Sequence, residues 1–541
     1  MYDGNKYYMF IYQSYPDVRL VGAPPSSIGK YGGDTDNWMW PRHTGDFSMF
    51  RVYADENNEP AEYSATNKPY KPKHHLPVNI KGVEKGDYAM IFGYPGSTDR
   101  YLTSYGVKWA TETDQPARVK IRRKKLDIYE AYMAQSDAVN IQYASKRARV
   151  SNYWKYFIGQ TKGLKRLNVY DKKKAQEDAF VAWANENDNR KEEYGEVINL
   201  FAKGYEAQNK YALGSTYLNE AVFGMESILF AYRFAGLRRT LADKESTPEK
   251  INSQAAALRG RAASHFKDYH APIDQEVTAA MLKMYHEDVP LDQQPAYLKK
   301  LVGKFKGNYE KLAAWIFKKS MLVDEAKVSA FLDNPKAKKL SKDPAYQLMS
   351  AFLNAYRGNI APKLAEADES MSKARRLFAK GLMEKNTDKT YYPNANSSMR
   401  MTYGQVLDYY PADAVYYKHF TTANGIMEKY VPGDHEFDLP KRMIDLFKEK
   451  NYGRYGTDGD LRICFISNND ITGGNSGSPV INGSGHLIGT AFDGNWEAMS
   501  GDIAFEKELQ RTISVDIRYT LWVIEVFAGA GHLVKEMTLI D

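Results

Sequence analysis

The stretch "DITGGNSGSPVING", residues 470–483, places a serine between glycines in a turn that ends at a proline. An apolar pair and an Asn-Gly hairpin signal follow it. A serine hydroxyl is a poor nucleophile near neutral pH unless a base lies beside it and a third group orients that base. Ser476 is therefore a candidate nucleophile. The alternative is that it is one more small residue in a tight loop.

The glycines around Ser476 suit the chemistry of acyl transfer, which needs backbone N–H groups aimed at the developing oxyanion. Gly474 can adopt a conformation that turns its N–H inward together with that of Ser476. Gly477 has no side chain and leaves room for a substrate backbone to approach. The turn therefore predicts an oxyanion site formed by the amides of Gly474 and Ser476.

A second polar feature is "DNWMWPRHTGDFSMF", residues 36–50. Asp46 follows a Thr-Gly turn at the start of an expected strand, where a carboxylate can orient a catalytic imidazole. The alternative is that Asp46 only caps the turn. A further motif, Gly93-Tyr94-Pro95-Gly96, is interpreted as a turn that ends a strand and has no other role.

Composition excludes several classes of protein. The chain has 541 residues, of which 43% are hydrophobic, enough for two or three domains. It has no apolar run of about 18 residues, so we expect no membrane span. The net charge of +7 is small, and basic clusters such as residues 118–125 lie among acidic residues, which favours solvated helix faces over nucleic-acid binding. With one cysteine, Cys464, there is no internal disulfide and no cysteine-based metal site, and no motif predicts a metal or cofactor.

The order of sequence patterns predicts a mixed β and α protein. Residues 5–100 contain short aromatic and β-branched runs separated by Gly, Pro and Asp. Residues 105–385 contain long stretches without proline that have helical spacing, and β patterns return after them. We expect a β-rich unit with a helical insertion, divided into residues 1–104, 105–388 and 389–541.

Three longer stretches carry a resemblance to a known family: "NWMWPRHTGDFSMFRVYAD", "YPNANSSMRMTYGQV" and "NDITGGNSGSPVING" with "GTAFDGNWEAMSGDI". Together they resemble the bacterial dipeptidyl-peptidase 7 and 11 family (serine peptidase family 46), closer to the dipeptidyl-peptidase 7 type, over the length of the chain. The resemblance implies a chymotrypsin-like double β-barrel, its first barrel incomplete here, with a helical domain inserted between the barrels. It also implies homodimers, in the periplasm or on the surface of Gram-negative bacteria, that release dipeptides from peptides with a free amino terminus.

The resemblance implies roles for the residues already singled out. Ser476 would be the nucleophile, Asp46 the triad carboxylate, and the amides of Gly474 and Ser476 the oxyanion hole. The substrate-binding residues that it implies are Asn37, Trp38, Arg42, Asn152, Asp493 and Gly494. Asp493 would pair with the substrate ammonium, with Asn37 and Asn152 around it. Asn152 lies in an otherwise helical stretch, where asparagine is mildly unfavourable, and its alternative role is a solvent-facing polar residue.

Gly494 bears on specificity. By the resemblance, members that prefer acidic residues have an arginine at this position. Glycine supplies no charge and is expected to leave space. We therefore expect a preference for an apolar or aromatic residue at the penultimate position.

The general base is the missing part. The chain order in the implied fold is His, Asp, Ser, and only His43 precedes Asp46, three residues away, which is too close. The other histidines are expected to be structural or on the surface: His74, His75, His265, His270, His286, His419, His435, His486 and His532. We therefore expect this sequence to lack an amino-terminal part that carries the base, and to be nearly inactive as written.

Two other functions stay open at this stage. The first is a non-catalytic peptide-binding homologue, which the absent base favours. The second is a trypsin-type endopeptidase, which shares the Ser476 turn. The helical block argues against the second, because such an insertion would obstruct a long substrate.

Overall fold

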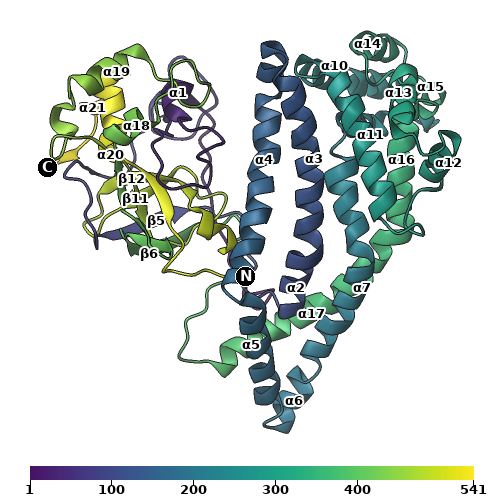
Figure 1. Ribbon diagram of the computed structural model, residues 1–541, viewed down its shortest axis with the longest axis horizontal. Coiled ribbons are helices and arrows are strands. Elements are labelled where there is room, and N and C mark those ends of the chain that lie inside the picture. Colours follow the sequence, from purple (N-terminus) through teal and green to yellow (C-terminus); the bar gives the residue numbers. More distant parts are fainter. The chain divides into compact units, whose positions relative to one another are not determined.

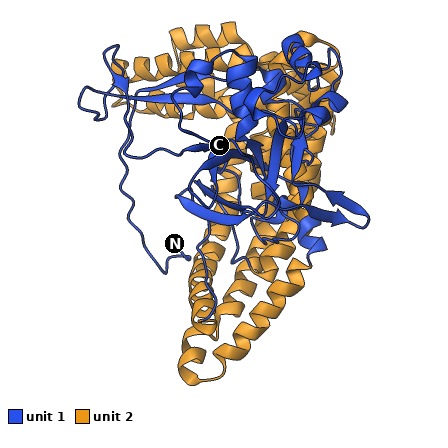
Figure 2. Cartoon of the chain, turned by 90° about the vertical axis from the view of Figure 1, so that its left-hand side faces the viewer, with its two compact units in different colours: residues 1–102, 162–167, 388–541 blue, residues 103–161, 168–387 orange.

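The protein, described over all of residues 1–541 in a computed structural model, forms two compact units (Figure 2). Unit 1 comprises residues 1–102, 162–167 and 388–541, and it holds every strand. Unit 2 comprises residues 103–161 and 168–387 and is helical. The expected mixture of β and α structure is confirmed, whereas the boundaries at 104 and 388 and the double barrel stay predictions.

The main sheet of unit 1 has nine strands. Seven follow one another in the order β6-β5-β11-β12-β13-β10-β9, and β4 joins at β12 and pairs with β14. The strands are β4 (Val78–Asn79), β5 (Tyr88–Gly93), β6 (Arg400–Gln405), β9 (Phe420–Thr422), β10 (Arg462–Ser467), β11 (Ser478–Ile481), β12 (Leu487–Gly494), β13 (Thr512–Asp516) and β14 (Leu539–Ile540). Strands from both ends of the chain therefore share one sheet.

Strand β5, from the first β region of the sequence, pairs with strands of the later β region. β5 pairs with β11 on one side and with β6 on the other, where Tyr88 faces Gln405 and Gly93 faces Arg400. The reason is burial: alternate residues of β5, Ala89 and Ile91, are fully buried in a small core with strands of the later region. Residues 94–399 lie between β5 and β6 in sequence.

The remaining elements of unit 1 surround this sheet. A three-stranded sheet has the order β1-β2-β3, and β7 pairs with β8 in a ribbon. These strands are β1 (Val18–Gly22), β2 (Met49–Ala54), β3 (Lys68–Pro69), β7 (Tyr409–Ala412) and β8 (Val415–Tyr417). The helices are α1 (Ser26–Gly29), α18 (Ala423–Lys429), α19 (Lys441–Lys448), α20 (Ile517–Trp522) and α21 (Gly531–Val534). Cys464 is buried in β10, as its apolar neighbours predict.

Unit 2 consists of long helices and shorter ones packed on them (Figure 1). They are α2 (Ser104–Trp109), α3 (Gln115–Met133), α4 (Asp137–Arg166), α5 (Val169–Ala184), α6 (Asp188–Tyr194), α7 (Val197–Tyr217), α8 (Glu226–Arg233), α9 (Ala235–Ala242), α10 (Pro248–Lys267), α11 (Ala271–Asp288), α12 (Ala296–Lys304), α13 (Tyr309–Lys319), α14 (Glu325–Asp333), α15 (Ala337–Ser341), α16 (Pro344–Ala355) and α17 (Ala361–Lys385). None of these helices is long and apolar enough to cross a membrane.

The ends of these helices are fixed by side chains as well as by packing. Asp343 precedes α16, and its carboxylate accepts hydrogen bonds from the amides of Ala345 and Tyr346 at 3.0 and 3.2 Å. Pro344 occupies the first turn, where its missing N–H costs nothing.

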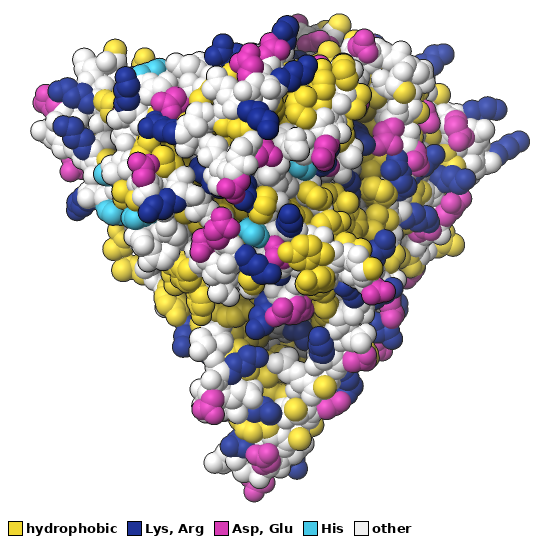
Figure 3. Space-filling view, turned by 60° about the vertical axis from the view of Figure 1, so that its left-hand side comes forward, with side chains coloured by type: hydrophobic (Ala, Val, Ile, Leu, Met, Phe, Trp, Pro, Cys, Tyr) yellow, Lys and Arg dark blue, Asp and Glu magenta, His cyan; other side chains and the backbone are white.

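On the face seen in Figure 3, basic and acidic side chains are interspersed with no broad patch of one sign.

Candidate active site

The Ser476 turn is held in shape by its buried neighbour Asn475. The Asn475 side-chain oxygen accepts a hydrogen bond from the amide of Thr472 at 3.1 Å, and its carbonyl accepts one from the amide of Ser478 at 3.0 Å. Ser476 itself is exposed, and its hydroxyl donates to the carbonyl of Phe492 at 3.2 Å. The turn therefore presents the hydroxyl to solvent beside β12.

The conformation of the turn requires its glycines. Gly474 has φ +106° and Gly477 has φ +86°, both in the left-handed region. A Cβ at Gly474 would also lie 2.8 Å from the amide nitrogen of Gly96. The amides of Gly474 and Ser476 donate to no acceptor in the chain. Two unused donors therefore lie beside the hydroxyl, as an oxyanion site needs, and that role stays a prediction.

The turn at residues 93–96 supports the Ser476 turn, a role that sequence analysis did not give it. The amide of Gly96 donates to the carbonyl of Gly473 at 2.7 Å. A Cβ at Gly93 would lie 2.5 Å from the side-chain nitrogen of Asn475. Both glycines are thus needed for close approach. The available signal was glycine on each side of Tyr94-Pro95, but the pairing of β5 with β11 that brings the two turns together is not visible in the sequence.

Asp493 is the centre of a buried group of polar residues. Its Oδ2 accepts hydrogen bonds from the Arg42 guanidinium and from the amide of Trp38, the latter at 3.1 Å. Its Oδ1 accepts from the amide of Gly494 at 2.8 Å. Burial raises the pKa of Asp493, and the Arg42 charge and the two amides oppose that effect.

A β-bulge sets the direction of the side chains in this part of β12. Ala491 pairs with Ser514 and Asp493 with Ile513, so Phe492 is an extra residue without an opposite partner. The carbonyl of Phe492 meets the Ser476 hydroxyl, and the next side chain, Asp493, meets Arg42. The bulge therefore joins the serine turn to the Asp493 group through consecutive residues.

The segment that carries Arg42 is anchored by residues that sequence analysis missed. The Arg42 Nε donates to the carbonyl of Asp36 at 3.0 Å, and its guanidinium lies 5.2 Å from the centroid of the Phe492 ring. Asp36 in turn forms an ion pair with Lys429 at 2.8 Å. Lys429 is on α18, far away in sequence, and no local pattern connects it with this segment.

Asp46 does not cap the turn that precedes it, because its carboxylate accepts no hydrogen bond from the chain. The side chain is open to solvent on one side. Burial by the protein on the other sides raises its pKa, Arg42 opposes this effect, and the Asp493 charge adds to it. The structure thus brings Asp46 close to Arg42 and Asp493 and leaves its carboxylate available.

Gly494 does not lie beside free space, which corrects the expectation from its missing side chain. The residue is buried, and an added Cβ would lie 2.9 Å from the Ala498 Cβ and 3.6 Å from the Trp38 ring. The space is filled because the strand ends here in a helical turn that folds Ala498 back onto it. The other expectation, that this position contributes no charge, is unaffected.

The two asparagines are placed differently. Asn37 is half-buried in unit 1, next to Trp38. Asn152 is half-buried on α4 in unit 2. The expected grouping of Asn152 with Asp493 therefore stays a prediction.

None of the ten histidines hydrogen-bonds the Ser476 hydroxyl. His43, the nearest in sequence to Asp46, is buried with its Nδ1 unpaired, and its other nitrogen faces Gly425. Burial, with the charges of Lys429 and Arg42, lowers the pKa of His43 to about 3. A ring with so low a pKa is a poor general base at neutral pH. His419 is also buried and bonds Asp408 at 2.9 Å.

The buried state of His43 predicts acid sensitivity. Its pKa falls from 6.5 to about 3 on folding, so below about pH 6.5 the unfolded chain binds a proton that the folded chain does not. The stabilisation is complete above pH 6.5 and is lost as the pH falls towards 3. The slope for one proton is about 1.4 kcal/mol of unfolding free energy per pH unit.

The measurement is the midpoint of urea unfolding for wild type and His43→Gln between pH 7 and pH 4. We expect the variant to have the shallower dependence on pH, whatever its stability at pH 7. A matched substitution of exposed His435 should leave the slope unchanged. Equal slopes for wild type and His43→Gln would contradict the prediction.

Comparison with known proteins gives one family. The family described as Peptidase S46 matches residues 1–539. A dipeptidyl-peptidase 7 of Porphyromonas gingivalis is 45% identical over 100% of this chain and 75% of its own length. An Asp/Glu-specific dipeptidyl-peptidase of Flavobacterium psychrophilum is 42% identical over 100% of this chain and 75% of its own length.

Solved structures agree with this result. The crystal structure of Porphyromonas endodontalis DPP11 in complex with the dipeptide Arg-Glu matches with a TM-score of 0.89 and 35% identity. The match covers 100% of this chain and 77% of that one. Fold and sequence lead to the same assignment, and the chain belongs to the peptidase S46 family.

Proposed function

We propose that the protein is a serine-type dipeptidyl-peptidase that releases dipeptides from peptides with a free amino terminus. The observation that carries the proposal is the exposed Ser476 hydroxyl beside two unused backbone amides, joined through Phe492 to the buried Asp493 group. The names of the relatives, dipeptidyl-peptidase 7 and Asp/Glu-specific dipeptidyl-peptidase, support the reaction class. So does the dipeptide in the P. endodontalis crystal structure.

The proposed reaction proceeds through an acyl-enzyme. The Ser476 oxygen attacks the carbonyl carbon of the second substrate residue, and an imidazole oriented by Asp46 takes the hydroxyl proton. The amides of Gly474 and Ser476 stabilise the oxyanion. The imidazole returns the proton to the leaving amine, and water then releases the dipeptide. We assign the base to none of the ten histidines, because none of them hydrogen-bonds the Ser476 hydroxyl and because His43, the nearest in sequence to Asp46, is buried with a low pKa.

The Asp493 group accounts for recognition of the substrate amine. With both carboxylates ionised, Asp46, Asp493 and Arg42 together carry one negative charge, which attracts an ammonium group. The carboxylate of Asp493 already has three donors and keeps one acceptor position. Asn37 and Asn152 are proposed to complete the amine site. If the distance from this group to Ser476 accommodates two substrate residues, it would fix the product as a dipeptide.

For the side chain beside the cut we propose an apolar or aromatic preference. Gly494 contributes no charge, and the neighbours that close on it, Ala498 and the Trp38 ring, are apolar. The relatives include both kinds of name, so their names leave the preference open.

The test compares dipeptidyl substrates that end in Phe or Met with one that ends in Asp, using protein expressed from the complete gene. We expect kcat/KM to be at least tenfold higher for the apolar substrates, a difference of about 1.4 kcal/mol. Gly494→Arg with Ala498→Gly, which opens the space that the arginine needs, should shift the preference towards Asp. Faster turnover of the Asp substrate by wild type would overturn the assignment.

A non-catalytic peptide-binding homologue is the second candidate, and the specific observation in its favour is that the Ser476 hydroxyl has a carbonyl and not an imidazole as its partner. A fluorophosphonate separates the two, because it reacts with an activated serine. Stoichiometric labelling at Ser476 supports the peptidase, and binding of dipeptide without labelling supports the homologue.

Homodimerisation and a periplasmic or surface location are also proposed, on the resemblance alone.

A further inference from the structure

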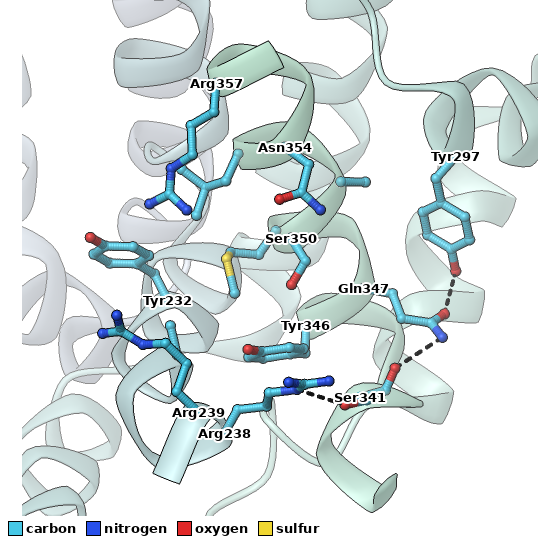
Figure 4. Close-up of a pocket in the computed structure, with 14 residues that line it drawn as sticks. Tyr232, Arg238, Arg239, Tyr297, Ser341, Tyr346, Gln347, Ser350, Asn354 and Arg357 are labelled. Carbon is cyan, nitrogen blue, oxygen red and sulfur yellow. Dashed lines mark hydrogen bonds between the residues drawn. The ribbon is translucent and has the colours of Figure 1, made fainter. Parts of the chain in front are cut away.

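A pocket in unit 2 lies entirely among helices that the proposed chemistry does not use (Figure 4). Its volume is about 680 Å³, within the range of small-molecule sites and much larger than one inorganic anion needs. Ten polar residues line it. Three are arginines, and none is aspartate or glutamate.

The three arginines keep their donors available. Arg239 and Arg357 form no ion pair and no hydrogen bond, and both are exposed at the pocket. Arg238 uses only its Nε, which donates to the Ser341 hydroxyl at 3.1 Å. Like charges held together without a counter-charge repel one another, so the arrangement costs free energy unless an anion occupies it.

Arg238 is oriented by a chain of hydrogen bonds along one side of the pocket. Tyr297 donates to the side-chain oxygen of Gln347 at 2.8 Å, and the Gln347 nitrogen donates to the carbonyl of Ser341 at 3.1 Å. The Ser341 hydroxyl then accepts from Arg238, and Figure 4 shows this chain along one side. The guanidinium is therefore held in place before any ligand binds, which lowers the entropic cost of binding.

The three arginines that line the pocket come from one helix and from one helical turn far away in sequence. Arg238 and Arg239 are on α9, and Arg357 is in the turn after α16. The charges of Arg238 and Arg239 both act on the Tyr346 hydroxyl, opposing the rise in its pKa that burial causes. In Figure 4, Arg357 and Arg239 approach Tyr232 from opposite sides.

A buried carboxylate close to the pocket, that of Asp343, does not neutralise this charge. Asp343 acts on Tyr297, but its oxygens accept from the Ser320 hydroxyl and from the amides of Met321, Ala345 and Tyr346. It is buried under the start of α16 and does not line the pocket. The pocket therefore presents a net positive charge to a ligand.

We propose that this pocket binds a small phosphorylated organic molecule. Planar guanidinium groups match phosphate oxygens with paired hydrogen bonds, and the three terminal oxygens of one phosphate group can accept from several guanidinium groups at once, whereas a carboxylate offers two oxygens. The hydroxyl of Ser350 and the amide of Asn354 supply further neutral donors. The rings of Tyr232 and Tyr346 and the remaining volume take the uncharged part of the ligand. The proposal does not depend on the peptidase reaction.

The test is isothermal titration calorimetry of the full chain with adenosine monophosphate, pyrophosphate and malonate as probes. We expect saturable binding of the two phosphate probes and binding of malonate at least tenfold weaker. Arg238→Gln, Arg239→Gln and Arg357→Gln should each weaken phosphate binding about tenfold, as the loss of a charged hydrogen bond implies. The control Arg261→Gln, at an exposed arginine of α10 outside the pocket, should bind like wild type.

Asn354→Asp gives an independent check that leaves the packing almost unchanged. It places a carboxylate among the guanidiniums, so we expect phosphate binding to weaken at least tenfold while the melting temperature stays the same or rises. The proposal is overturned if no phosphate probe saturates, if malonate binds as tightly as pyrophosphate, or if the arginine variants and Asn354→Asp bind like wild type.

Discussion

Replacing Ser476 with alanine is expected to lower kcat for dipeptide release by about 10⁴–10⁶, the loss seen when a triad nucleophile is removed. The hydroxyl has one hydrogen-bond partner, the carbonyl of Phe492, so little of the surrounding structure depends on it. Binding of a product dipeptide should therefore change by less than about threefold, because a solvent-exposed neutral hydrogen bond is worth little. Steady-state kinetics and calorimetry on protein from the complete gene measure the two effects.

Ser484→Ala is the matched control. Ser484 is another exposed serine, in the hairpin turn just beyond β11, and its substitution should leave kcat unchanged. A fluorophosphonate should label wild type and Ser484→Ala and leave Ser476→Ala unlabelled. If Ser476→Ala retained a tenth of the wild-type rate, Ser476 would not be the nucleophile.

Replacing Asp493 with asparagine is expected to lower kcat/KM by about 10²–10³, which lies within the range of about 2–5 kcal/mol lost when one partner of a buried charged pair is removed. Two causes act together. The group of Asp46, Asp493 and Arg42 loses its net negative charge, and Arg42 is left without the carboxylate that it pairs with. The substrate ammonium then has no counter-charge at the position that sets the cleavage site.

The sharpest measurement uses the substrate amine itself. Wild type should strongly prefer a free amino terminus to an acetylated one, and Asp493→Asn should lose most of that preference. The matched control is Asp413→Asn, at an exposed aspartate in the turn between β7 and β8. Melting temperatures separate misfolding from lost recognition. A folded Asp493→Asn variant that kept the full preference for a free amine would show that the ammonium binds elsewhere.

Those parts of the site that are contiguous in sequence could be predicted. Gly474 adopts a left-handed conformation that its lack of a side chain allows, and the amides of Gly474 and Ser476 are unused. Asp46 likewise proved to be a free carboxylate and not a turn cap. In these cases the local chain carries both the residue type and the geometry that it needs.

The parts that depend on long-range pairing could not be predicted. The turn at residues 93–96 supports the serine turn only because β5 lies next to β11. Lys429 holds Asp36 from a distant helix. Gly494 seemed to offer space, but Ala498 and Trp38 fill it. Strand order and side-chain packing depend on contacts between segments that are far apart in sequence. A single amino-acid sequence does not reveal which of these segments meet.

The pairing of β5 with β6 has a consequence for how the protein folds. These neighbouring strands are separated by residues 94–399, and closing a flexible loop of that length costs about 5 kcal/mol in chain entropy. Within unit 2, the first helix, α2, and the last, α17, both pack on α5 and α7, so folding of the helices gathers the two ends of the insertion. Helices that form early would remove most of the entropic cost. The rate at which the turn of Ser476 reaches its native structure would then depend on a segment that contributes no strand to the neighbouring sheet.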